Sequence, residues 1–503
     1  MSLDGFAKAS VCVTLLTIKS VGAPLPCAGC HPNETARFLA SAMGNSLAPP
    51  EPLPPGRIEH QSSGSVITIE DRGGRMVHRL VERGLAAEYP IAYQIGQGKK
   101  GRTYMVRIGN YLLESPASWY QGHGWDISPG YETLQLVDFD RPITGECLFC
   151  HAGQAKFADP DARRLATQAI TAITCERCHG PSDEHIRKPS AKNIINPAKL
   201  SGAARASVCE QCHLEGETRV LNPGKTLQDF EAGQTLERTV VTYLFKTNTG
   251  QAVTQSEELA ESKCARSSAG KLWCGSCHHP HGTTADRQRE LRGVCMSCHQ
   301  TLSKASHPRA RAECVSCHMP ARPTTNIAHV AATDHRIQRP HTTALKYSGP
   351  DTVTAWREPA AGLRDRDLGM AQLQIAITRE LQSLAQEGLE RLQKLPGGQL
   401  SNDADALSML RTIDAARRVV ELRPQSASSA VSLALALKQS GNPQEAEQQL
   451  RRAIDLDPSL MDSYAQLALL YDEQKRTKDA ADTIARFLKW NPWNIQFRLA
   501  RAP

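Results

Sequence analysis

Aromatic residues are scarce in this chain, and so are long apolar runs. Phenylalanine, tryptophan and tyrosine together make up 5% of the 503 residues. Beyond residue 25, no stretch approaches the roughly 20 apolar residues that a membrane-spanning helix needs, which excludes a protein built from such helices. A chain of this length can build a core, yet its front part has few of the large side chains that fill one. This shortage indicates an interior that is not made of protein alone.

Cysteine, in contrast, is frequent and strictly patterned. Of the 16 cysteines, 14 fall in seven Cys-x-x-Cys-His units. The cysteine pairs are Cys27/Cys30, Cys147/Cys150, Cys175/Cys178, Cys209/Cys212, Cys274/Cys277, Cys295/Cys298 and Cys314/Cys317. The histidines that follow them are His31, His151, His179, His213, His278, His299 and His318. Only Cys12 and Cys264 lie outside the pattern, and Cys264 is expected to be a free thiol.

Three chemistries use a Cys-x-x-Cys pair: a zinc site, a redox disulfide and the attachment of a c-type haem. Zinc sites usually combine two such pairs, and seven is an odd number. A redox disulfide needs a single pair and no adjacent histidine. Haem attachment explains the whole pattern, because each thiol adds to one vinyl group of the porphyrin and the histidine then lies beneath the iron. The sequence therefore predicts seven covalently bound haem c groups, with the seven histidines as iron ligands.

Seven haems between residues 27 and 318 leave too little protein to surround each one separately. We therefore expect the haems to pack against one another and to form much of the apolar interior, with short helices and long irregular connections. The haems also alter how the formal net charge of +7 should be interpreted. Each ferric bis-imidazole haem contributes roughly −1, so the loaded protein is close to neutral and its basic balance does not indicate nucleic-acid binding.

Ten histidines remain outside the motifs, and several of them follow a motif closely. They suggest second axial ligands, because iron held by two imidazoles is six-coordinate and suited to electron transfer. His185 follows His179, and His281 follows His278, so each is expected to reach a neighbouring haem rather than its own. The other candidates are His60, His307, His329 and His335. His279 is expected to face solvent, because adjacent residues cannot point at the same place.

Several segments are similar to one protein family. They are CAGCHPNETARFLASAMGNS, SPASWYQGHGWDISPGYE, RPITGECLFCHAG, ITCERCHGPSDEH, SVCEQCHLEGE, KLWCGSCHHPHG and CVSCHMP followed by TDHRI. They resemble periplasmic multihaem cytochromes c related to the tetrahaem cytochrome of ammonia oxidisers, in the branch with C-terminal tetratricopeptide repeats. The resemblance covers nearly the whole chain. It implies stacked, mostly bis-histidine haems for electron transfer, and distal roles for His185, His281 and the histidines after CHMP, but no particular substrate.

Six candidate distal histidines serve seven haems, so one second ligand is missing. Met43, in SAMGNS after the first motif, is one candidate, and a methionine ligand would raise the reduction potential of its haem. The alternative for Met43 is apolar packing on a helix. His78 is the rival ligand. If neither side chain binds, one haem is open and could carry out chemistry.

We expect the chain to divide into several parts. Residues 1–25 have the features of a secretory signal, which predicts a periplasmic or extracellular protein. Residues 26–345 are expected to form a heptahaem domain, mainly α with sparse secondary structure. Within it, residues 56–140 alternate apolar and polar side chains around glycine-rich turns, which predicts a small antiparallel β-hairpin insert. Residues 346–365 are expected to be a linker.

Residues 366–503 lack cysteine and show an internal period. Prolines recur at a spacing of 34 residues, at Pro424, Pro458 and Pro492. This period is typical of the tetratricopeptide repeat, a helix–turn–helix unit, and it defines two clear units at 427–458 and 459–492. Such α-helical solenoids generally present a surface to a protein partner. A structural cap on the haem domain and a dimer contact are the alternatives.

The expected function is electron relay along the haem chain, with a redox partner protein docked on the repeats. A membrane-associated redox complex is one such partner. The first alternative is an enzyme that acts on a small nitrogen or sulfur species at one five-coordinate haem. The second is a subunit of a conductive filament, assembled through ligands donated between chains.

Overall fold

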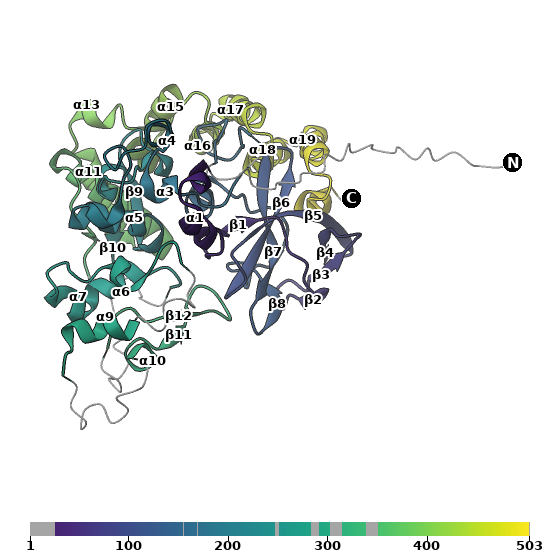
Figure 1. The fold of residues 1–503 in the computed structure, drawn as a ribbon. Coiled ribbons are helices and arrows are strands. Elements are labelled where there is room, and N and C mark those ends of the chain that lie inside the picture. The colour runs from purple at the N-terminus through teal and green to yellow at the C-terminus, as the bar shows by residue number, and fades with distance from the viewer. Residues whose placement is uncertain are drawn as a thin grey trace.

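A computed structural model of the chain describes residues 26–153, 155–167, 170–246, 251–282, 291–301, 314–338 and 351–501. Three regions can be followed in Figure 1. We call residues 47–143 the β module, residues 26–46 and 144–338 the motif region, and residues 364–501 the repeat domain. The predicted signal at residues 1–25 and the candidate ligand His307 lie outside the described residues.

The β module is an eight-stranded antiparallel sheet. Its strands are β1 (Leu47–Ala48), β2 (Gly56–Glu59), β3 (Val66–Asp71), β4 (Met76–Glu82), β5 (Leu85–Ile95), β6 (Gly101–Ile108), β7 (Tyr111–Tyr120) and β8 (Gly124–Ile127). Strands β2 to β8 pair in chain order, and β1 pairs with β5. Strand β8 also returns to contact β2, so the sheet is nearly closed.

The prediction of a small insert is therefore wrong, although its limits enclose seven of the eight strands. The alternating pattern of residues 56–140 buries one face of consecutive long strands, and such a face is covered most completely when the sheet curls on itself. Ile67, Leu80, Tyr104, Val106 and Phe139 lie in the resulting core with almost no exposure. The sheet is thus a packing unit in its own right.

The motif region has short helices and long connections, as expected. Its helices are η1 (Pro26–Gly29), α1 (Pro32–Leu39), α2 (Gly145–His151), α3 (Glu176–His179), α4 (Asp183–Arg187), η2 (Pro197–Lys199), α5 (Gly202–His213), η3 (Leu227–Asp229), η4 (Leu236–Arg238), α6 (Gln255–Glu261), α7 (Lys263–Ser267), α8 (Cys274–Cys277), α9 (Leu291–Cys298) and α10 (Cys314–His318). Two small sheets join them, formed by β9 (Thr218–Leu221) with β10 (Val240–Leu244), and by β11 (Ala321–Pro323) with β12 (Ala331–Thr333).

The repeat domain is entirely helical in its described part. Its helices are α11 (Arg364–Arg379), α12 (Gln382–Gln393), α13 (Gly397–Leu400), α14 (Ala404–Leu410), α15 (Ile413–Leu422), α16 (Ala427–Gln439), α17 (Pro443–Leu456), α18 (Met461–Glu473), α19 (Thr477–Trp490) and α20 (Ile495–Ala500). The pairs α16/α17 and α18/α19 coincide with the two predicted repeat units. Small buried residues such as Ala434 and Ala446 let these helices approach closely. Among the described helices, none has an apolar stretch long enough to cross a bilayer.

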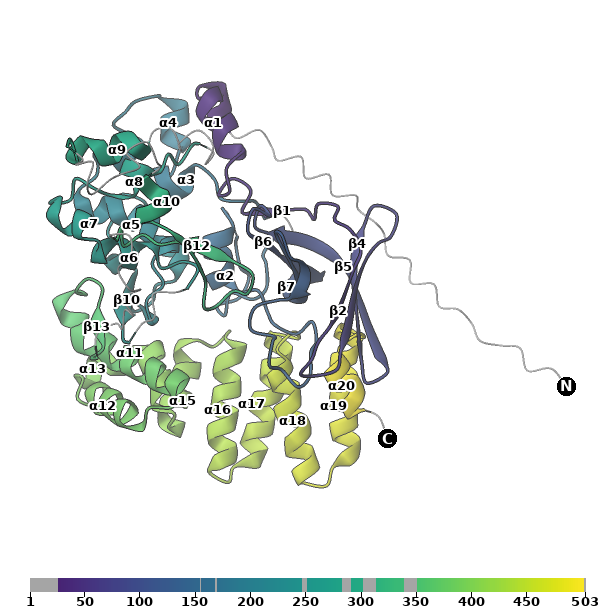
Figure 2. The ribbon, with the colours of Figure 1, turned by 90° about the horizontal axis from the view of Figure 1, so that it is seen from below.

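The repeat domain contacts both other regions, and Figure 2 shows its helices in a row from the motif region to the β module. At one end, α11 packs on β9, and β13 (Thr354–Ala355), from the predicted linker, pairs with β10. At the other end, Ile495 of α20 lies in the core of the β module. Between them, Arg163 forms an ion pair with Asp457 at 2.9 Å. The repeat domain therefore packs along one side of the molecule and connects the motif region to the β module.

Candidate haem-binding site

Each Cys-x-x-Cys-His unit described here is built on a helical turn. In four of them, the backbone N–H of the histidine donates to the carbonyl of the first cysteine: His31 to Cys27 at 2.8 Å, His179 to Cys175 at 3.0 Å, His278 to Cys274 at 2.8 Å and His299 to Cys295 at 3.0 Å. This turn places the first cysteine, the second cysteine and the histidine on one face, because positions i, i+3 and i+4 are neighbours on a helix. Each motif therefore presents two thiols and one imidazole together.

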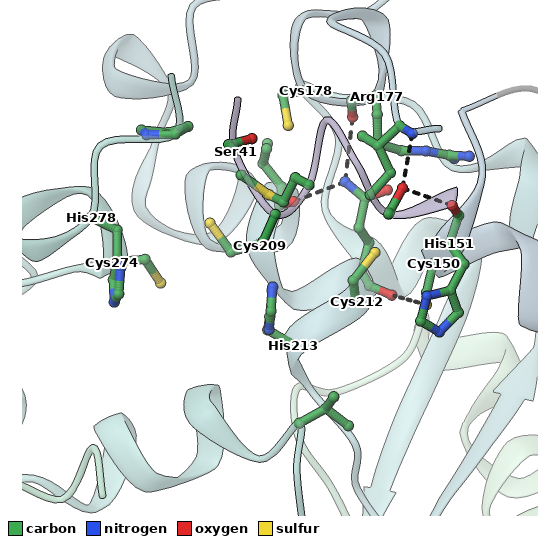
Figure 3. Close-up of a pocket in the computed structure, with 18 of the residues that line it drawn as sticks. Ser41, Cys150, His151, Arg177, Cys178, Cys209, Cys212, His213, Cys274 and His278 are labelled. Carbon is green, nitrogen blue, oxygen red and sulfur yellow. Dashed lines mark hydrogen bonds between the residues drawn. The ribbon is translucent and has the colours of Figure 1, made fainter. Parts of the chain in front are cut away.

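The first five motifs surround one cavity. All of their cysteines and histidines line it, from Cys27 and His31 to Cys277 and His278. Figure 3 shows thiols and imidazoles of several motifs around the same open space. The cavity volume is about 2540 Å³, whereas a pocket for one small ligand measures about 300–1,000 Å³. The space is therefore large enough for several bulky groups.

The sixth and seventh motifs lie away from this cavity, and none of their cysteines and histidines lines it. Cys317 of the seventh motif is exposed, and so is Cys298 of the sixth. Cys30 of the first motif is exposed as well, although it lines the cavity. Among the described residues, the cavity therefore brings together five of the seven motifs. Haem attachment stays a prediction at every motif.

Three pairs of imidazoles face each other across gaps in this cavity. His31 lies 6.4 Å from His185 with 15° between the ring planes, His179 lies 5.8 Å from His281 with 13°, and His278 lies 6.0 Å from His335 with 22°. These centroid separations are too wide for nearly parallel rings to stack directly face to face. An imidazole nitrogen binds a first-row metal at roughly 2 Å, so two rings on opposite sides of one metal have centroids roughly 6 Å apart. The three pairs have the spacing of axial ligands.

Burial lowers the pKa of several histidines at this cavity. It lowers the pKa of His151, His213 and His335 below the ordinary value of 6.5, and it is also the main cause of the lowered pKa of His281. A neutral imidazole keeps the lone pair that a metal needs. Burial also raises the pKa of the Cys178 thiol to about 11. For these four imidazoles the direction of the pKa shift favours the neutral form that an iron ligand needs.

Thiols of different motifs approach each other. Cys27 interacts with Cys175, Cys150 with Cys212, Cys209 with Cys274, and Cys295 with Cys314. None of the described cysteines forms a disulfide. These contacts join the first motif to the third, the second to the fourth, the fourth to the fifth, and the sixth to the seventh. Groups attached at these motifs would be close neighbours.

Two arginines offer hydrogen-bond donors to the same cavity, although Arg102 also forms an ion pair with Glu51 at 2.6 Å. Arg102 and Arg177 both line it, and the Nε atom of each is buried without a hydrogen-bond partner. A buried donor normally has a partner, so an orphaned one points to a missing acceptor. Haem propionates are acceptors of this kind. The residues present therefore fit haem groups in shape, donor chemistry and charge.

The candidate distal ligands do not all reach the cavity. His185, His281, His335 and Met43 line it, and His279 is exposed at its edge. His60 does not line it: its Nδ1 lies 2.8 Å from Ser63 Oγ and its Nε2 lies 3.1 Å from the Glu132 carbonyl. His60 therefore fixes a turn of the β module in this structure.

His78 and His329 also lie elsewhere. His78 is fully buried inside the β module, where its Nδ1 lies 2.7 Å from Ser115 Oγ and burial lowers its pKa to about 3. His329 contacts the turn between β7 and β8. Of the two rivals for the seventh ligand, Met43 is the one at the cavity. It lies on a loop that Ser46 fixes to the second motif by donating to the His151 carbonyl at 2.8 Å.

Sequence reasoning missed the residues around His329. His123 and Asp126 lie in a segment quoted only for its family resemblance, and nothing in their spacing connects them to a residue about 200 positions later. Cys264, outside the motifs, is free and near Cys295 of the sixth motif.

Comparisons with known proteins agree with two parts of this description. The family model "Cytochrome c554 and c-prime" matches residues 133–180, which hold the second and third motifs. The model "Tetratricopeptide repeat" matches residues 427–460, which hold α16 and α17. The chain thus combines a c-type cytochrome segment, whose family implies covalently bound haem c, with C-terminal tetratricopeptide repeats. None of the curated proteins matches it.

Solved structures match only a part of the chain. "Crystal structure of MamA" is 19% identical, with 27% of this chain and 81% of that chain covered, at a TM-score of 0.22. "Crystal structure of YrrB: a TPR protein with an unusual peptide-binding site" is 17% identical, with 28% and 73% covered, at a TM-score of 0.24.

Proposed function

We propose that the chain is an exported, periplasmic or extracellular heptahaem cytochrome c that relays electrons between protein partners. When bound, the haem irons supply reversible one-electron chemistry. The observation that carries the proposal is the set of three imidazole pairs at 5.8–6.4 Å across a cavity lined by five attachment motifs. Two fixed imidazoles hold an iron in one coordination state, which limits rearrangement when an electron arrives or leaves.

The pairs also suggest which distal ligand serves which motif. His185 would serve the first motif, His281 the third and His335 the fifth. In each case the distal ligand comes from a segment after another motif, so each ligand ties two motifs together. The chain's own contribution is to hold the rings of each pair nearly parallel, and partial burial lowers the pKa of His281 and His335.

Mass and spin state test this proposal. The mature protein under denaturing conditions is expected to carry the added mass of seven haems. His185→Ala should convert one haem from low spin to high spin in the electron paramagnetic resonance spectrum. His279→Ala is the matched control: His279 lies 5.8 Å from His281 but at 66° rather than parallel to it, so no haem should change. An unchanged spectrum in His185→Ala would contradict the assignment.

One observation favours the alternative of a reductase or oxidase. Among the described residues, no second imidazole lies parallel to His151 or His213, so the haem on either motif could keep an open position. Met43 lines the same cavity next to the loop residue Ser46, which binds the His151 carbonyl, so it is the candidate ligand to close one of them. Binding of cyanide or nitrite to the reduced or oxidised protein, strengthened in Met43→Ala, would favour catalysis at such a haem.

The repeat domain supports docking of a redox partner. Leu435 and Leu469 occupy the same position in successive repeats and are 36% and 51% exposed. Exposed apolar side chains at repeated positions form a surface that another protein can cover. Leu435→Asp with Leu469→Asp is expected to slow electron exchange with the partner while the haem spectrum stays the same.

A further inference from the structure

Three potential metal ligands meet outside the cavity. His123 and Asp126 come from the turn and strand at β7 and β8, and His329 comes from the loop between β11 and β12. Their donor atoms all lie within 4.8 Å of one another. Asp126 Oδ2 is 2.7 Å from His329 Nε2 and 3.4 Å from His123 Nε2. Both imidazoles thus direct the same ring nitrogen at one carboxylate oxygen.

The local structure fixes each donor. The His123 N–H donates to the Tyr120 carbonyl at 3.1 Å, which closes the turn. Asp126 Oδ1 accepts from the Ile127 N–H at 2.7 Å, which leaves Oδ2 free to face the histidines. His329 packs edge-on against Tyr120, with ring centroids 5.1 Å apart, in a left-handed backbone conformation with φ of 58°. The Thr324 hydroxyl donates to the Ile327 carbonyl at 2.7 Å and steadies the loop.

One of the two distances matches a metal site. Donors bound at about 2.0–2.2 Å to a tetrahedral ion lie roughly 3.3 Å apart, close to the 3.4 Å between His123 and Asp126. The 2.7 Å between His329 and Asp126 is a hydrogen-bond distance, and it would widen when an ion enters. The two imidazole rings are nearly parallel, with centroids 3.5 Å apart and 12° between the planes. Stacking two rings with their N–H dipoles aligned is unfavourable, whereas two lone pairs directed at one cation are stabilised. Because the rings are nearly parallel, they must tilt apart for both lone pairs to reach one ion.

We propose that His123, Asp126 and His329 bind a divalent first-row transition-metal ion, with solvent completing the coordination. Two imidazoles and one carboxylate form a donor set that suits zinc and copper(II) rather than magnesium or calcium. His123 and His329 are exposed, so an ion can enter from solvent. The site needs no haem and does not rest on the proposed function.

Such an ion would join the β module to the motif region. The β11–β12 hairpin holds His329 in its loop and is followed by His335, which faces His278 in the cavity. Figure 1 shows this hairpin extending from the motif region toward β8. A metal at the loop would therefore fix the position of the segment that supplies His335.

Zinc titration of the haem-loaded protein tests the site. After chelator treatment and desalting, the wild-type protein is expected to bind one zinc ion per chain in calorimetry, confirmed by elemental analysis. His123→Ala and His329→Ala should each weaken binding by more than the roughly 10–100-fold that loss of an outer-shell partner costs. Gln121→Ala, an exposed change in the same turn, is the matched control and should bind zinc like the wild type.

The haem spectrum separates this site from the other role considered for His329. If His329 binds zinc, His329→Ala keeps every haem in its original spin state. If His329→Ala alters a haem while zinc binding is unchanged, His329 is an axial ligand and the proposed metal site is wrong. Absence of stoichiometric zinc binding in the wild type, or binding as tight as the wild type's in both histidine variants, would also overturn it.

Discussion

The motif region and the repeat domain are both helical, but different forces hold them together. Helices α16–α19 bury a continuous set of leucine, alanine and aromatic side chains, among them Leu437, Leu450 and Tyr464. Helices α3, α8 and α10 bury no residue at all. The repeat domain therefore folds around its own side chains, whereas the motif region surrounds a large apolar space that its own residues do not fill.

This difference is consistent with the scarcity of aromatic residues. A core needs apolar surface, but the sequence need not supply it if porphyrins fill this space, as we propose. Each motif would then use residues for attachment and ligation, and the connections between motifs would need only to reach the next attachment point. The β module, with its own core of Ile67, Leu80 and Tyr104, belongs with the repeat domain in this respect.

Production of the chain without haem attachment is expected to have the largest effect. The cavity of about 2540 Å³ would lose the groups that we propose to fill it, and apolar cavities far smaller than this already cost several kcal/mol. Hydrogen exchange read by mass spectrometry should show an unprotected motif region beside protected helices α16–α19. The β module serves as an internal control and should stay protected. Equal protection in all three regions would contradict the distinction between them.

The complementary change removes apolar packing from the repeat domain. Leu437 is completely buried, and Leu437→Ala is expected to lower the free energy of unfolding of this domain by about 2–5 kcal/mol. The haem absorption spectrum should stay the same. Chemical denaturation followed by far-ultraviolet circular dichroism measures the loss.

Leu469→Ala, at a half-exposed position in the following repeat, is the control and should change stability by less than about 0.5 kcal/mol. If Leu437→Ala instead disturbed the haem spectrum strongly, the two regions would depend on each other more than their separate cores suggest.

Local chemistry and periodicity could be read from the sequence, and long-range geometry could not. The 34-residue period identified both repeat units, because each unit repeats the same local packing. The motifs predicted the attachment residues for a similar reason, since three neighbours on one turn carry the chemistry. The exposure of Cys317 could not be read in this way, because it depends on which distant segments pack over its helix. The alternation in residues 56–140 indicated strands, but whether a sheet closes depends on contacts such as β2 with β8 that no local pattern reveals.

The candidate distal ligands lie between these two cases. His185, His281 and His335 were predicted from their places after motifs, and the structure adds which motif histidine each one faces. For His60, hydrogen bonds to Ser63 and to the Glu132 carbonyl decide its placement, and a residue 72 positions away is invisible to local reasoning. The group formed by His123, Asp126 and His329 was missed because two modules must meet to create it.

The junction between the repeat domain and the β module should respond to pH. Burial, with a contribution from Asp140, raises the pKa of Asp138 from 3.8 to about 7. Between about pH 4 and pH 7 the folded protein holds a proton on Asp138 that the unfolded chain releases. The contribution of Asp138 to the free energy of unfolding is therefore complete below about pH 4 and is lost as the pH rises to about 7. The expected loss is roughly 1 kcal/mol for each pKa unit, and Asp140 acts in the same direction.

Asp138→Asn isolates this contribution. The Asp138 carboxylate accepts from the backbone N–H groups of Ile495 and Gln496 at the start of α20, and an asparagine keeps one carbonyl acceptor there without a charge. Hydrogen exchange in α20, compared with wild type at each pH, should therefore become less pH-dependent between about pH 4 and pH 7. Asp472→Asn, on an exposed part of α18, should leave that dependence as it is. If the protection of α20 falls with rising pH as much in Asp138→Asn as in the wild type, the junction between the repeat domain and the β module does not depend on this buried carboxyl. Apolar contacts such as those of Ile495 would then hold the junction without it.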